Sequence, residues 1–155
     1  MKKVLLALDG SKGSKAAIDC FVELLSCAKL DEVLLMYVER YAGSSFMDDM
    51  VTDAEMTTLN EVLTGTEYKE ALDKRAASII EAHKVILEGK GVKTIKTVIK
   101  SGHPAEEILK TAKDENADMI FIGSKGNRHH SVIMGSVSRE IVNRSDIPVF
   151  IAKVK

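Results

Sequence analysis

Two glycine–serine motifs near the end of the chain have the residue types and spacing of a phosphate-binding loop. The first is Gly123-Ser-Lys-Gly126, and the second, Gly135-Ser136-Val137-Ser138, begins nine residues after Gly126. The apolar run Asp118–Ile122, typical of a buried strand, precedes them, and apolar residues at helical spacing follow. Backbone N–H groups at a helix N-terminus bind anions, and glycine lets an anion approach without a Cβ in the way. The pattern therefore predicts a phosphate site, although tight turns also select Gly and Ser for their positive φ.

The charge distribution favours an anionic ligand for the same half of the chain. Residues 90–155 contain 12 Lys or Arg and 7 Asp or Glu, so they carry a charge of +5, against −6 for residues 1–89. Lys125 and Arg128 lie inside the glycine loop, where they could also be ordinary solvated charges. The net charge of −1 gives no support for general nucleic-acid binding.

Apolar patterning predicts alternating strands and helices. Strands are expected at residues 3–8, 32–38, 92–99, 119–122 and 148–152. Helices are expected at about residues 16–28, 72–87, 104–115 and 133–143. The apolar stripe of the first helix would comprise Ala16, Ala17, Cys20, Phe21, Leu24 and Ala28. Five strands with helical crossovers require a parallel sheet with helices on both faces, so we expect one α/β domain over residues 1–155.

One acidic segment interrupts this alternation. Residues 41–68 contain no Lys or Arg and six acidic residues. The methionines and leucines of this segment could form a short helix or a lid over a site. A mobile excursion from the domain is the simpler interpretation.

Composition excludes several classes of protein. The 155 residues, 45% of them hydrophobic, are typical of one globular domain. No apolar run approaches the roughly 20 residues that span a bilayer, so no membrane partner is expected. The start, Met1–Asp9, has only five apolar residues before the aspartate, which predicts a first strand rather than a signal peptide and hence a cytoplasmic protein. The two cysteines and four histidines lack metal-site spacing, so no metal ligand is predicted.

Motifs spread over the chain, apart from the acidic segment, resemble the universal stress protein family. They are Val4-Leu-Leu-Ala-Leu-Asp9-Gly-Ser11, Leu34-Leu-Met-Tyr-Val38, Ser101-Gly-His-Pro104, Ile122-Gly-Ser-Lys-Gly126, Gly135-Ser-Val-Ser138 and Ile147-Pro-Val149. The resemblance implies a flavodoxin-like sheet of order 3-2-1-4-5, similar to the adenine nucleotide alpha hydrolases, and an ATP site that could include Mg²⁺. In this order the first and fourth strands are neighbours, and ligands bind at their carboxyl ends. Asp9 and Gly123 stand at those two ends.

The resemblance also implies which residues would surround the base and the ribose. Ala7, Leu8 and Asp9 would flank them, with the Asp9 carboxylate accepting from a sugar hydroxyl or the base amine. Val38 would contact the adenine, and Gly123 would approach the ribose. Alternatives remain, because Asp9 could be a turn residue before the first helix and Val38 could simply pack within its strand.

By the same resemblance, Gly126, Gly135, Ser136 and Val137 would hold the phosphates through backbone N–H groups and the Ser136 hydroxyl. The chain departs from the family pattern at one point. Eight residues, Asn127–Met134, separate the second and third glycines, where the nucleotide-binding pattern has nine. A shorter loop could rotate the phosphate donors away from their ligand.

These features favour an adenine-nucleotide (ATP)-binding module for stress response and signalling over an enzyme. Phosphoryl transfer needs a positioned metal and an oriented nucleophile, and the sequence offers neither a Gly-x-x-x-x-Gly-Lys-Ser/Thr motif nor an evident general base. No catalytic residue is therefore assigned. A slow ATP hydrolase using the same pocket, and a nucleotide-free dimeric scaffold favoured by the shorter loop, are the alternatives. The sequence does not indicate which stress, protein partner or nucleotide is physiological.

The last strand predicts a homodimer. In the implied order, residues 147–154 form an apolar strand at the sheet edge, and an exposed edge promotes association. Two copies related by a two-fold axis could pair this strand antiparallel. Lys153 and Lys155 could instead protect a monomeric edge.

Overall fold

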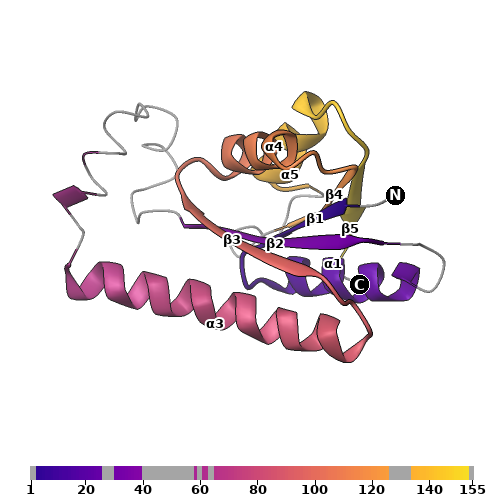
Figure 1. Cartoon of the computed structure of the whole chain (residues 1–155). Helices are drawn as coiled ribbons and strands as arrows, with labels where there is room; N and C mark the ends of the chain where they lie inside the picture. The colour runs from indigo at the N-terminus through magenta and orange to yellow at the C-terminus, as the bar shows by residue number, and fades with distance from the viewer. Residues whose placement is uncertain are drawn as a thin grey trace.

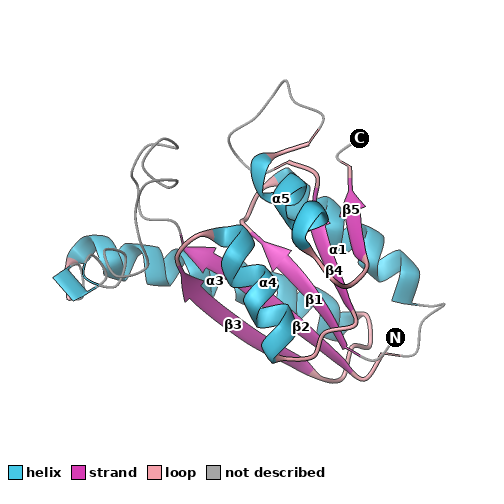
Figure 2. Cartoon of the chain, turned by 90° about the horizontal axis from the view of Figure 1, so that it is seen from above, coloured by secondary structure: helices cyan, strands magenta, loops and turns pink. Residues whose placement is uncertain are grey.

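The protein folds as one parallel sheet between two layers of helices (Figures 1 and 2). The computed structural model describes residues 3–25, 30–39, 58, 61–62, 65–125 and 134–153. The strands are β1 (Lys3–Leu8), β2 (Glu32–Glu39), β3 (Ile95–Ser101), β4 (Met119–Gly123) and β5 (Val149–Ala152). The helices are α1 (Lys12–Leu25), α3 (Glu67–Gly89), α4 (Pro104–Asp114) and α5 (Ser136–Arg144). The strand order β3-β2-β1-β4-β5 confirms the predicted flavodoxin-like topology.

The central strands are buried on both faces, which explains their nearly continuous apolar sequences. In β1 and β2, Val4 pairs with Val33 and Leu5 with Leu34, and all four side chains are fully buried. Side chains on one face of the sheet pack against α1 and α3, and those on the other face pack against α4 and α5. Figure 1 shows these layers below and above the sheet. Helices packed on both faces of the sheet therefore hold the ends of the central strands in position.

Helix α1 uses a different stripe from the one expected. Phe21 and Ala17 are buried as predicted, and Ile18, which the pattern did not include, is equally buried. Leu24 was expected in the stripe but is 40% exposed, so that prediction is wrong. Phe21 packs edge-on against Phe121 of β4, with ring centroids 5.2 Å apart, and this contact fixes which face of the helix turns inward.

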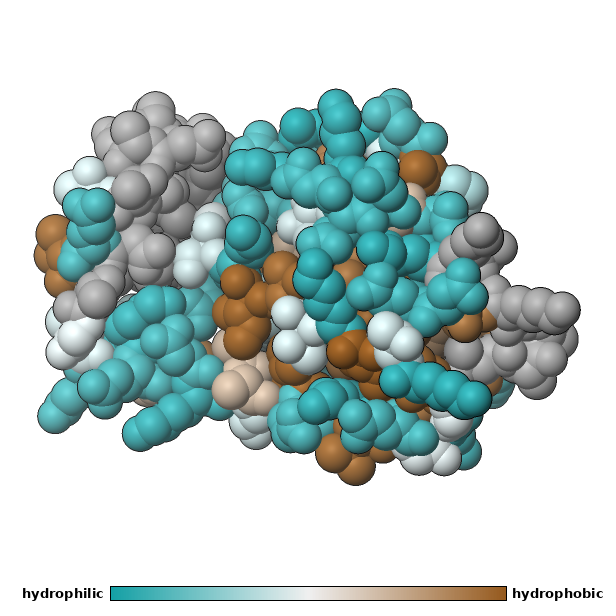
Figure 3. All heavy atoms as spheres, viewed as in Figure 1, coloured by the Kyte–Doolittle hydropathy of each residue, from teal (hydrophilic) through white to brown (hydrophobic). Residues whose placement is uncertain are grey.

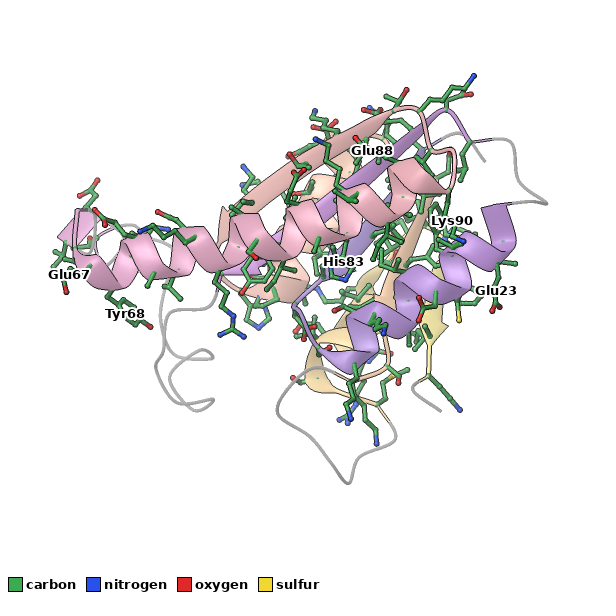
Figure 4. The ribbon with its side chains drawn as sticks, turned by 90° about the horizontal axis from the view of Figure 1, so that it is seen from below. Glu23, Glu67, Tyr68, His83, Glu88 and Lys90 are labelled. Atoms are coloured by element: carbon green, nitrogen blue, oxygen red, sulfur yellow. The ribbon has the colours of Figure 1, made fainter. Side chains whose placement is uncertain are left out.

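Helix α3 begins earlier than the apolar pattern indicated. Thr66 caps it, because its side chain accepts a hydrogen bond of 3.3 Å from the Lys69 N–H. The helix therefore starts inside the predicted acidic segment, most of which lies outside the described residues. Its end, at Gly89 with Gly91 following at a φ of 88°, agrees with the prediction. The end that carries Glu67 and Tyr68 projects beyond the sheet, while His83 lies where the helix runs beside α1 (Figure 4).

Strand β3 is the edge opposite β5 and is largely solvent-exposed. It begins at Ile95 rather than Val92, three residues later than predicted, and its Ile99 is 44% exposed. Hydrophobic atoms are visible in the middle of this side of the molecule, surrounded by hydrophilic ones (Figure 3). Among the described residues, no helix combines the length and hydropathy required to cross a membrane.

Candidate functional site

Asp9 follows β1 at the carboxyl edge of the sheet and is partly committed to a turn. Its Oδ1 accepts a 2.9 Å hydrogen bond from the Ser11 N–H, as in the turn that the sequence left open as an alternative. Gly10, inside the turn, has a φ of 72°, which favours glycine. Asp9 is half-buried, and its Oδ2 has no hydrogen bond with any other described residue. One carboxylate oxygen therefore shapes the turn, and the other can accept from a ligand.

The turn after β1 is attached directly to the loop after β4. The Ser11 hydroxyl accepts from the Ser14 N–H at 3.2 Å, which caps α1, and it also lies 3.4 Å from the Lys125 carbonyl oxygen, to which it can donate. Close to this bond, the backbones of Gly13 and Gly123 are in contact, and a Cβ on Gly123 would lie 2.3 Å from the Gly13 carbonyl carbon. Gly123 is therefore required for packing against α1. This partner, Gly13, was missed by the sequence analysis.

A second set of hydrogen bonds connects the loop after β4 to the start of α5. The buried Ser124 donates its N–H to the Ala152 carbonyl at 2.7 Å, and its own carbonyl accepts from the Gly135 N–H, also at 2.7 Å. The Ser138 hydroxyl lies 3.1 Å from the Ser124 oxygen and 3.0 Å from the Gly135 oxygen, so its proton can serve either acceptor. These bonds fix the position of the α5 N-terminus relative to β4 and β5.

The first turn of α5 presents N–H groups without a capping side chain. Gly135 is the N-cap residue and makes no side-chain cap, and Ser136 begins the helix in an exposed position. The backbone N–H groups at such an end have no partner within the helix, and the helix dipole makes the end electropositive. Gly135 has a φ of −71°, so the positive φ that turns often require does not explain this glycine. Its Cβ position is in ordinary contact with the Ser124 oxygen, at 3.5 Å.

Four further predicted residues direct their side chains into the protein core. Ala7 and Leu8 are 6% and 4% exposed and belong to the cores on opposite faces of the sheet. Val38 and Val137 are half-buried against the core that α4 and α5 cover. Only backbone groups, or the exposed parts of the two valines, can therefore contact a ligand.

The predicted Gly126 and the loop residues around Arg128 lie outside the described part of the chain. The remaining predicted residues fall at the ends of β1, β2 and β4 and at the start of α5. Since β1 and β4 are hydrogen-bonded neighbours, with Leu6 opposite Phe121, Asp9 and Gly123 end adjacent strands at one edge. The predicted proximity of these two strand ends is therefore confirmed.

Ionisable side chains gather beside this edge, at the end of β2. Burial raises the pKa of Tyr37, the nearby Glu39 and Asp9 raise it further, and Arg75 lowers it. Glu39 is 1% exposed, and its Oε2 binds the Lys69 ammonium at 2.5 Å and the Ser101 hydroxyl at 3.2 Å. Its Oε1 is buried with no hydrogen-bond partner. These charges couple α3 to the ends of β2 and β3.

Taken together, the edge offers an acceptor on Asp9 and backbone donors on α5. It therefore suits a ligand that carries hydroxyl or amine donors at one end and anionic oxygens at the other. Among the described residues at this edge, no nucleophile–base pair is formed.

This chain is similar in sequence and in structure to known proteins of one family. The model of the universal stress protein family matches residues 1–153. Universal stress protein MJ0577 of Methanocaldococcus jannaschii is 31% identical over 157 aligned positions, which cover 99% of this chain and 96% of the relative. Its solved structure superposes with a TM-score of 0.78 at 30% identity, covering 99% of this chain and 96% of that one. The chain belongs to the universal stress protein family.

More distant structures share the fold. A universal stress protein family protein from Arabidopsis thaliana, At3g01520, was solved with AMP bound. It gives a TM-score of 0.69 at 18% identity and covers 100% of this chain and 93% of its own. A universal stress protein solved in complex with cAMP gives a TM-score of 0.65 at 16% identity, and the alignment covers 97% of this chain and 95% of that one.

Proposed function

We propose that the protein binds an adenine nucleotide, preferably ATP, at the carboxyl ends of β1 and β4, and that it acts in the cytoplasm as a stress-response signalling module. The observation that carries the proposal is the pairing of Asp9 Oδ2, which has no hydrogen bond among the described residues, with the N-terminus of α5 at one edge. Ribose and adenine supply hydrogen-bond donors for the first, and phosphates supply the anion for the second. The AMP and cAMP in the two distant relatives support the choice of an adenine nucleotide.

The residues present fit such a ligand. The Gly123–Gly13 contact and the Ser124–Gly135 hydrogen bond hold the two binding elements in fixed positions before a ligand arrives. Such preorganisation reduces the entropic cost of binding. The exposed Ser136 hydroxyl would add a donor beside the phosphates. We expect a dissociation constant in the micromolar range, about 8 kcal/mol.

Calorimetric titration with ATP, ADP and AMP tests the proposal. Asp9→Asn is the informative variant, because its side-chain oxygen still accepts from the Ser11 N–H while the free acceptor becomes an NH₂ donor. We expect a loss of about 1.5–3 kcal/mol in binding and an unchanged far-UV CD spectrum. Asp19→Asn, on the exposed side of α1, makes the same charge change away from the site and should bind as the wild type does.

The titration also separates the alternatives. Phosphate release from ATP in the presence of Mg²⁺, abolished by Asp9→Asn, would support the slow hydrolase. No heat and no thermal shift at millimolar nucleotide would contradict the proposal and favour the nucleotide-free scaffold.

We further propose that two copies associate through β5. The structure has β5 at the sheet edge, and the carbonyls of Pro148 and Ala152 accept hydrogen bonds from the N–H groups of Ile120 and Ser124. Along a strand, backbone groups that face one neighbour alternate with groups that face the other side. The N–H groups of Val149 and Ile151 therefore point away from β4, where a second copy could pair antiparallel.

Sedimentation equilibrium at micromolar concentration tests this dimer. Lys153→Pro removes another N–H on the outer side of the strand without removing a core side chain, and we expect it to weaken association. A wild-type species of 17.0 kDa would contradict the dimer.

A further inference from the structure

Three potential metal ligands meet where α4 and α5 lie side by side, on the face of the sheet opposite α1 and α3 (Figures 1 and 2). His103 immediately precedes α4, Glu106 is in its first turn, and Glu140 projects from the second turn of α5. One ligand atom from each lies within 4.8 Å of the other two. This His–Glu–Glu cluster takes no part in the nucleotide site described above.

The distances within the cluster suit ligands that share an ion better than a direct bond. His103 Nε2 lies 3.7 Å from Glu140 Oε2, which is longer than a hydrogen bond. Ligands held at about 2.0–2.2 Å around a tetrahedral zinc ion are separated by roughly 3.3–3.5 Å. Small rotations of the two glutamate side chains, which are 52% and 30% exposed, would bring all three atoms to that separation.

Among the described residues, the two carboxylates of the cluster share one cationic side chain. Arg144 is the cation that contacts both carboxylates, with Nη1 at 2.5 Å from Glu140 Oε1 and 3.5 Å from Glu106 Oε1. One guanidinium therefore serves two carboxylates. The Arg144 contact with Glu140 is made at Oε1, and the other oxygen of Glu140, Oε2, faces His103.

From this geometry we infer that His103, Glu106 and Glu140 form a zinc site. An imidazole nitrogen with two carboxylate oxygens is a ligand set for Zn²⁺, whereas Mg²⁺ and Ca²⁺ prefer oxygen ligands alone. Water would complete the coordination on the exposed side. Zinc competes with Arg144 for Glu106, and it joins the start of α4 to α5.

The surroundings of His103 set the expected affinity. When Nε2 binds zinc, the ring proton is on Nδ1, and Nδ1 is buried with no hydrogen-bond partner. Zinc-binding histidines usually donate that proton to a carboxylate or carbonyl, and loss of such a partner typically weakens binding about 10–100-fold. With three protein ligands and this deficit, the site binds zinc in the micromolar range.

Calorimetric titration of the metal-stripped full chain with ZnCl₂ tests the site. We expect one saturable site per chain, which His103→Ala or Glu140→Gln weakens at least about ten-fold. Arg144→Gln should tighten binding several-fold, because it removes the competing cation. If the cluster only stabilised the packing of α4 on α5, Arg144→Gln would not increase the affinity for zinc. His103 makes no side-chain cap to α4, so its replacement should leave the fold intact, as CD melting checks.

Two controls locate the ion. His83→Ala changes a histidine on α3 whose Nδ1 is bonded to the Ile79 carbonyl, and zinc binding should be unaffected. The double variant His129→Ala/His130→Ala should also bind as the wild type does. The inference is overturned if the wild type shows no saturable binding below about 1 mM, if His103→Ala binds normally, or if the double variant abolishes binding.

Discussion

Gly123 and Gly135 both belong to the glycine motifs of the sequence, but they meet different constraints in the structure. At Gly123 the constraint is space, because its Cβ would overlap the Gly13 backbone. At Gly135 the φ of −71° and the ordinary contacts leave room for a Cβ. The sequence has a glycine at position 123 within the first motif. That this glycine packs against α1, which is distant in the sequence, can be learned only from the structure. For the same reason the sequence analysis missed Gly13.

Gly123→Ala should therefore destabilise the fold, and Gly135→Ala should not. We expect the first to lower the free energy of unfolding by about 1–3 kcal/mol through overpacking, and the second to change it by less than about 0.5 kcal/mol. Urea denaturation followed by CD measures both. Equal effects of the two substitutions would show that the contact with α1 is not the constraint.

The raised pKa of Tyr37 predicts a loss of stability at alkaline pH. Since burial raises its pKa in the folded state above the unfolded value of about 10, the folded state retains a proton that the unfolded state has lost. The resulting stability is complete below about pH 10 and is lost as the pH rises through the folded-state pKa. Tyr37→Phe should therefore lose less stability than the wild type between about pH 9 and pH 11. If thermal melts showed that the wild type and Tyr37→Phe lose the same stability over this pH range, the expectation would be contradicted.

At the scale of elements, the buried carboxylate of Glu39 connects α3 to the sheet. Lys69, in the first turn of α3, supplies its cation and also binds Asp73 at 2.8 Å. Lys69→Met would leave Glu39 buried without that charge, which we expect to cost about 3 kcal/mol of folding stability. Glu39→Gln should cost less, because Lys69 keeps Asp73. A double variant no worse than Lys69→Met alone would establish the coupling, and additive losses in urea denaturation would contradict it.

The elements themselves were largely predictable, and the differences have identifiable causes. Continuous apolar runs predicted β1 and β2, and the Pro104 signal gave the start of α4. The start of α3 depends on the Thr66 cap within a polar segment where apolar spacing gives no signal. The zinc ligands were not predicted, because Glu140 follows His103 by 37 positions and only the packing of α5 on α4 brings them together.

At the scale of the whole molecule, the proposed nucleotide site depends on three segments that the sheet order brings to one edge. The turn after β1, the loop after β4 and the start of α5 are held by hydrogen bonds that involve Ser11, Ser124 and Ser138. The resemblance to the family indicated these segments, but the hydrogen bonds between them are seen only in the structure. The shortened stretch between Gly126 and Gly135 is therefore bounded by fixed backbone at Ser124 and Gly135.

Inserting one glycine within Asn127–Met134 restores the nine-residue spacing and tests how strongly the loop length affects nucleotide affinity. We expect the melting temperature to change little, because each added residue costs only a fraction of a kcal/mol in loop closure. Nucleotide affinity should change measurably in the calorimetric titration. A large fall in melting temperature would show that the loop length is part of the fold.

The Ser124–Gly135 hydrogen bond has a consequence for how such a protein can evolve. Because this bond joins the described backbone on the two sides of the loop, we expect changes in loop length to leave α5 and β5 in place. Mutations in the loop can then alter ligand preference while the scaffold remains under separate selection. A lineage can thus change the length and sequence of this loop without first acquiring compensating changes in its core.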